Sequence, residues 1–139
     1  MRRHLVLRVQ AKLLIPMILL FALYVQFHGD YGPGGGFQAG VIFASGFILY
    51  ALVFGPDQAE RVAPRGVLRI MTAVGLLLYA GTGVLAMLLG ANFLDYDALA
   101  HDPVHGQHYG IIAIELGVGI TVASGLMLAY FQFARRGIE

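Results

Sequence analysis

The acidic residue Glu115 is the first candidate for chemistry in this sequence, because it stands inside a long apolar stretch. It is the one acid between residues 109 and 133, about six residues, or ~9 Å along a helix, from the beginning of that stretch. If the stretch crosses a membrane, an ionisable group at that depth is costly and would be kept to exchange a proton or a cation. An ordinary hydrogen bond to a neighbouring helix is the alternative, and His108, two turns earlier on the same face, is a candidate partner.

Histidines and aspartates gather in the polar segment before Glu115. They include Asp97, His101, Asp102, His105 and His108. The His-x3-His spacing of His101 and His105 matches two metal ligands on one helical face. The segment also contains Pro103 and Gly106 and has no other ligand signature, so we expect no metal and no cofactor. A group of histidines that responds to pH is an equally simple interpretation.

The third candidate is the glycine-rich stretch 28–40, which reads HGDYGPGGGFQAG. Three glycines after a proline disfavour a stable helix or strand interior in water, because glycine loses the most backbone freedom on folding. A phosphate-binding loop is not expected, since neither G-x-G-x-x-G nor a following Lys-Ser/Thr pair is present. We expect either a shaped re-entry with close backbone contacts or an ordinary tight turn. The residues involved are Pro33, Gly34, Gly35, Gly36, Phe37 and Gly40.

The composition shows what must position these residues. Of 139 residues, 58% are apolar and 12% charged, whereas soluble domains have about 45–50% and about 25%. These values are typical of an integral membrane protein. The net charge of +1 gives no reason to expect a nucleic acid partner. The absence of cysteine excludes disulfides, thiolate nucleophiles and cysteine-bound metals.

Four apolar stretches are long enough to cross a membrane, since about 20 helical residues span a ~30 Å hydrocarbon core. They are residues 8–27, 37–54, 67–90 and 109–133. We therefore predict an all-α integral membrane protein with four transmembrane helices in a single domain, residues 1–139. Lys12 is expected to extend its ammonium group toward the membrane surface. We group Lys12 with Glu115 and His108 as candidates for an ion pathway.

Small residues recur at every fourth position in two of these stretches. They are Gly36, Gly40 and Ala44 in the second, and Gly117, Thr121 and Gly125 in the fourth. Faces of this kind let another helix approach closely. The spacing leaves open whether the partner helix belongs to this chain or to another subunit.

The distribution of basic residues predicts the orientation in the membrane. All nine Lys and Arg residues lie near the N-terminus, in the polar segment 57–69 or near the C-terminus. The glycine-rich connection and the segment 91–108 contain none. By the positive-inside rule, both termini are cytoplasmic and these two connections face outside. Within 57–69, Arg61, Arg65 and Arg69 would form one basic ridge if the segment were a continuous helix.

The glycine-rich stretch, followed by Val41 and Ile42, resembles the signature of the MnhB family, a subunit of the multisubunit cation/proton antiporters called Mrp or Mnh. The resemblance extends over the chain in length, in its four spans and in its basic termini. It implies an accessory subunit, not an enzyme, in the plasma membrane of a prokaryote. The assembly would exchange Na+ for H+, with other subunits and membrane lipids as partners and no organic cofactor.

The resemblance also implies a role for the motif residues, as structural or subunit-contact positions. The family's best-understood proton routes lie on large antiporter-like subunits, so the candidate role of Glu115 rests on its depth alone. The equivalent membrane subunit of an ion-translocating hydrogenase or a complex I-like oxidoreductase is an alternative. A small proton-coupled exporter is less favoured, because those proteins usually carry their membrane acid in the first span, and residues 8–27 contain no acid.

Overall fold

The computed structural model describes residues 4–28, 35–90 and 103–137, with side chains from residue 110 onward in the last range. These parts of the chain form helices and contain no strand. The helices are α1 (Leu5–Phe27), α2 (Gly36–Phe54), α3 (Pro56–Val62), α4 (Arg65–Leu88) and α5 (Pro103–Arg136). Four of them are long and apolar enough to cross a membrane, with α5 qualifying from Gly110 onward. The prediction of an all-α protein with four transmembrane helices is confirmed.

Each of the four long helices begins earlier than its apolar stretch indicated, α1 and α5 by the most. α1 begins at Leu5 and contains Pro16 in its interior. α5 begins at Pro103, within the segment expected to be a polar connection. Proline is favourable at a first helical position, because its missing N–H would have no acceptor within the helix there. His105 and His108 consequently stand in the first turns of α5.

The short helix α3 separates two basic residues that were expected to share a ridge. It follows Gly55, whose φ of 103° lies in the left-handed region that favours glycine. It begins with Pro56 and ends at Val62, and α4 begins only after Pro64. Arg61 and Arg65 therefore lie on different helices, and the continuous basic ridge is not formed.

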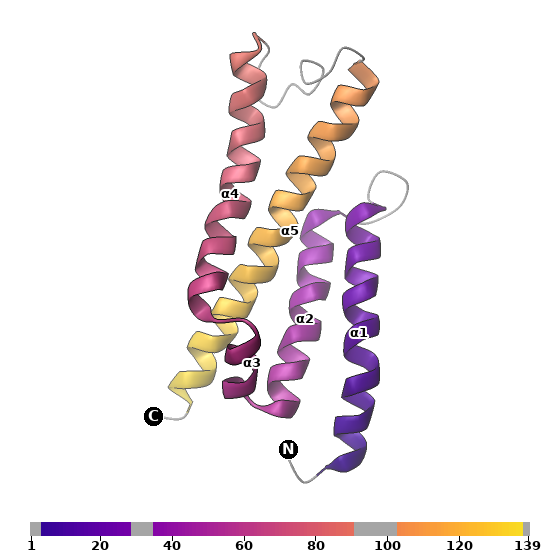
Figure 1. Ribbon diagram of the computed structural model, residues 1–139, viewed down its shortest axis with the longest axis vertical. Helices are drawn as coiled ribbons and strands as arrows, with labels where there is room; N and C mark the ends of the chain where they lie inside the picture. Colours follow the sequence, from indigo (N-terminus) through magenta and orange to yellow (C-terminus); the bar gives the residue numbers. More distant parts are fainter. Residues whose placement is uncertain (1–3, 29–34, 91–102, 138–139) are drawn as a thin grey trace.

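The four long helices lie in a row, in the order α4, α5, α2, α1 (Figure 1). α5 packs against both α4 and α2, whereas α1 packs mainly against α2. α3 lies at the end of the molecule where α1 begins and α5 ends (Figure 1). The molecule is thus one layer of helices, and the residues in α5 have neighbours on two sides.

An apolar cluster and a pair of ion pairs join the helices near α3. The Phe47 and Phe131 rings meet edge to face at 6.0 Å, linking α2 to α5. Glu60 of α3 accepts hydrogen bonds from Arg135 Nη2 (3.0 Å) and Arg65 Nε (2.8 Å). These two guanidinium groups hold the pKa of the Glu60 carboxyl below its usual range. Glu60, Arg65 and Arg135 form a charged cluster, the Glu60 clamp, that ties α3 to α4 and α5 at the end of the molecule where α5 ends.

Candidate functional site

Glu115 lies where α5 crosses the beginning of α2. A Cβ atom on Gly36 would lie 2.8 Å from the carbonyl carbon of Glu115 and 2.9 Å from its Cα. Real Cβ atoms do not approach backbone atoms so closely, so the two helices meet at a distance that only glycine permits at this position. The Glu115 carboxylate lies beside Gly35, the residue before Gly36. Its Oε1 atom is 3.5 Å from the position that a Cβ atom on Gly35 would occupy.

The beginning of α2 is a favourable place for this carboxylate. The first hydrogen bond there runs from the Ala39 N–H to the Gly35 carbonyl (3.0 Å), so the N–H groups of residues 36–38 have no acceptor within the helix. The positive end of the helix dipole attracts a negative group. Gly35, the residue that precedes the helix, has no side chain to serve as a cap. Glu115 supplies an acidic group to this end of α2 from the neighbouring helix.

The close contact continues one turn further along both helices. A Cβ on Gly40 would lie 2.7 Å from the Gly119 carbonyl oxygen and 2.9 Å from Cβ of Val122. Gly36, Gly40 and Ala44 are all buried. The small-residue face of α2 therefore packs against α5 of the same chain.

Gln26 is a polar residue near this site that the sequence pattern did not single out. It comes from the end of α1, is 9% exposed, and its Oε1 lies against Gly119 of α5. Gly119 is one turn, or ~6 Å, beyond Glu115. The signal in the sequence was weak: a lone amide close to the end of an apolar stretch. Three helices therefore meet around Glu115 and Gly119, with one acid and one amide among apolar side chains.

The opposite side of α5 makes a similar contact with α4. Cβ atoms added to Gly75 and Gly117 would each lie 2.8 Å from the carbonyl oxygen of the other residue. Further along, Thr72 Oγ1 donates a hydrogen bond to Ser124 Oγ (2.8 Å), which itself donates to the Ile120 carbonyl (2.6 Å). Gly117 and Gly119 thus serve contacts inside this chain on opposite sides of α5, whereas a Cβ added to Gly125 would meet no described atom within 4 Å.

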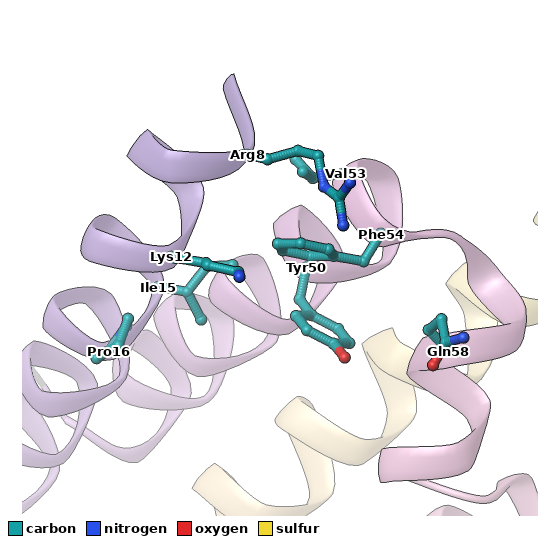
Figure 2. Close-up of a pocket in the computed structure, with 8 residues that line it drawn as sticks. All are labelled: Arg8, Lys12, Ile15, Pro16, Tyr50, Val53, Phe54 and Gln58. Atoms are coloured by element: carbon teal, nitrogen blue, oxygen red, sulfur yellow. The ribbon is translucent and has the colours of Figure 1, made fainter. Parts of the chain in front are cut away.

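Lys12 lies at the end of the molecule where α1 begins and α2 ends, whereas Glu115 lies near the beginning of α2. It shares a hollow with Arg8 and with residues near the end of α2, including Tyr50 (Figure 2). Gly36 and Tyr50 are separated by about 21 Å along α2. The structure does not bring Lys12 and Glu115 together, so their grouping in one ion pathway stays a prediction without support from proximity.

Several predicted residues cannot be placed beside Glu115 by their side chains. His108 stands on α5 two turns before Glu115, and its side chain is not among those described. Pro33, Gly34, Asp97, His101 and Asp102 lie outside the described residues. Among the side chains that are described, no three histidines or acids are grouped so as to hold a metal ion.

These features define a small multi-pass membrane protein, built from four apolar helices around a glycine-dependent contact that holds one carboxylate. Residues 6–128 match the family described as a domain related to the MnhB subunit of Na+/H+ antiporter. The chain belongs to this family. Its relatives include the mnhB2 antiporter subunits of Staphylococcus aureus strains Newman and JH1. Each is 38% identical over 120 residues, which cover 84% of this chain and 84% of the relative.

Proposed function

We propose that this protein is an accessory subunit of a multisubunit Na+/H+ antiporter and has no catalytic activity of its own. Its family is related to the MnhB antiporter subunit, and its bacterial relatives are named as antiporter subunits. Na+ and H+ are the transported ions in this proposal. The other subunits of the assembly and the surrounding lipids are the partners of the chain.

The single-layer arrangement of the helices is the observation that carries the proposal. α4 has α5 as its one extensive helix contact within the described residues, and α1 is similarly attached to α2. Large apolar side chains consequently remain uncovered, such as Leu77 on α4 (68% exposed) and Leu20 on α1 (67% exposed). A row of helices has two broad apolar faces, which suit it to lie between larger membrane subunits or between such a subunit and lipid.

Glu115 is the residue that we propose to contact the transported cation or proton. It is half-buried within a transmembrane helix, and α2 and α5 hold its backbone at a fixed distance from the glycine-rich stretch. His108 is its proposed neighbour on the route, because both stand on one face of α5. Pro33, Gly34, Gly35, Gly36, Phe37 and Gly40 are proposed to shape the connection that places this carboxylate and to contact other subunits.

The proposal is tested by measuring antiport in everted membrane vesicles from a bacterial strain that lacks its own Na+/H+ antiporters. A fluorescent pH indicator reports proton release when Na+ is added to energised vesicles. Three strains are compared: one with the chain and the genes that accompany it, one with the same set lacking this chain, and one with the chain alone. We expect antiport only in the first, together with co-purification of the chain with large membrane subunits.

Each remaining outcome contradicts the proposal in a different way. Antiport by the chain alone would make it a self-sufficient transporter. Full activity without it would show that it is not needed by the assembly. Co-purification with redox subunits, and no antiport, would assign it to an ion-translocating oxidoreductase.

A further inference from the structure

A basic hollow lies between α1 and α2, at the end of the molecule where α1 begins and α2 ends, away from Glu115. Its volume is about 630 Å³. Arg8 and Lys12 line it from α1, Tyr50 and Phe54 from α2, and Gln58 from α3. Figure 2 shows the Arg8 and Lys12 side chains extending from α1 toward the two aromatic rings of α2. The proposed antiporter function makes no use of this hollow.

The two cations in the hollow have no acidic partner in the described part of the chain. The ion pairs in the described part of the chain join Glu60 to Arg65 and Arg135, which do not line the hollow. Arg8 is held over the Phe54 ring, with its guanidinium carbon 5.4 Å from the ring centroid. Lys12 follows one helical turn later, on the same side of α1. Two positive charges thus face one open space, and an anion placed there would be attracted to both.

The position of the hollow identifies the kind of anion. Arg8 is close to the beginning of α1, and Phe54 is the last residue of α2. Both helices are transmembrane candidates, so these two residues lie at the membrane boundary. Basic pockets between transmembrane helices at this level bind phospholipid headgroups. Tyrosine is enriched at the membrane interface, because its ring is apolar and its hydroxyl group is polar.

The apolar part of the hollow distinguishes a lipid from a small soluble anion. Ile15 and Pro16 of α1 line the side that leads toward the membrane interior, and Val53 adds an apolar side chain near the boundary. Ile15 lies about 10 Å deeper along α1 than Arg8. A free phosphate would use only the cations, whereas a phospholipid would place its phosphate beside them and its acyl chains along the apolar wall.

We propose that Arg8 and Lys12 bind the headgroup phosphate of an anionic glycerophospholipid, held between α1 and α2 against Tyr50, Phe54 and Gln58. Arginine suits this role because its planar guanidinium group donates two parallel hydrogen bonds to phosphate oxygens. The Phe54 ring orients that group, and the Lys12 ammonium adds a second charge. The bound lipid would fill the space beside α1. This helix packs extensively only against α2, whereas α5, the other transmembrane helix beside α2, also packs against α4.

The test is native mass spectrometry of the full chain, purified in mild detergent, stripped of lipid and titrated with defined phospholipids. The probes are phosphatidylglycerol, phosphatidylcholine and inorganic phosphate. We expect the wild type to bind phosphatidylglycerol at least tenfold more tightly than phosphatidylcholine, and inorganic phosphate not to compete. The double variant Arg8→Gln/Lys12→Gln should lose at least tenfold in affinity for phosphatidylglycerol.

A matched control removes the same charge elsewhere at the same end of the molecule. Arg61 and Arg69 are exposed and do not line the hollow, so Arg61→Gln/Arg69→Gln should bind within twofold of the wild type. An equal loss in this control, or none in the double variant, would overturn the proposal. Competition by inorganic phosphate would assign the hollow to a soluble anion instead.

A milder substitution keeps the test decisive if the double variant does not fold. Phe54→Leu retains both cations and an apolar side chain but removes the ring under the guanidinium group. We expect it to weaken phosphatidylglycerol binding by about threefold, with the helical circular dichroism signal unchanged. Wild-type affinity in both Phe54→Leu and Lys12→Gln would overturn the proposal.

Discussion

At the residue scale, the position of Glu115 is explained by the glycines that face it. A carboxylate in a transmembrane helix needs donors or a positive potential, and the beginning of α2 provides both. Gly36 allows the backbone of α2 to come within contact of the Glu115 backbone, which a side chain at this position would prevent, and Gly35 stands beside the Glu115 carboxylate. This arrangement serves a structural carboxylate and an ion-exchanging one equally well, so an experiment must separate them.

Replacing Glu115 by Gln removes the charge and keeps nearly the same shape. If the carboxylate contacts the transported ion, we expect Glu115→Gln to lower the antiport rate of the assembled complex by at least about a hundredfold, the scale of lost proton transfer by a positioned group. Glu115→Asp should retain part of the rate with a displaced pH profile. Antiport is measured in everted vesicles across a pH series, and co-purification confirms assembly.

The matched control for this substitution is Asp57→Asn. Asp57 is an exposed acid in α3, outside the transmembrane helices. Its loss should leave the rate within twofold and the pH profile unchanged. If Glu115→Gln assembles and shows the wild-type rate and pH profile, Glu115 does not carry ions and serves only to join α5 to α2.

At the element scale, the sequence predicts the transmembrane helices well and their connections poorly. The four spans follow from hydropathy, which depends on composition along the chain and needs no knowledge of contacts. The break at Pro64 and the start of α5 at Pro103 depend on single prolines inside polar segments. Hydropathy is insensitive to such positions.

The sequence also could not predict which helices pack against the small-residue faces. Spacing shows that Gly36 and Gly40 share a face, but the helix that meets them is fixed by tertiary packing. Gln26 was missed for the same reason. It lies beside Gly119 only because the end of α1 reaches α5, and nothing local to either segment predicts that contact.

Two adjacent glycines allow the α2–α5 contact to be tested directly. A Cβ on Gly36 would overlap the Glu115 backbone, whereas one on Gly35 would make an ordinary contact at 3.5 Å with the Glu115 side chain. We expect Gly36→Ala to destabilise the chain by about 1–3 kcal/mol, as overpacking commonly does. Gly35→Ala should be close to neutral. Thermal unfolding in detergent, followed by circular dichroism, measures both.

The comparison between these two variants is informative because they differ by one position. Both add one methyl group to the same glycine run. Equal melting temperatures for Gly36→Ala and the wild type would show that α2 and α5 are further apart than in this structure. A large loss in both variants would instead indicate that the run tolerates no side chain, for a reason other than this contact.

At the scale of the whole molecule, an even number of spans predicts that the beginning of α1 and the end of α5 lie on the same side of the membrane, and Figure 1 shows both at the same end of the molecule. The basic hollow and the Glu60 clamp lie at that end, and the Glu115 site lies toward the other. If the basic end is cytoplasmic, the lipid site would take its ligand from the inner leaflet, and Glu115 would exchange ions nearer the outer surface.

This orientation can be measured because the chain contains no cysteine. Single cysteines replace His4 before α1, Gly137 after α5, or Leu89 after α4, which is 55% exposed. With a membrane-impermeant maleimide on intact cells, we expect Leu89→Cys to be labelled at once, and His4→Cys and Gly137→Cys only after permeabilisation. The reverse pattern would place the termini outside and move the lipid site to the outer leaflet. Labelling of His4→Cys and Gly137→Cys from opposite sides would contradict four spans, since an even number returns the chain to the side on which it began.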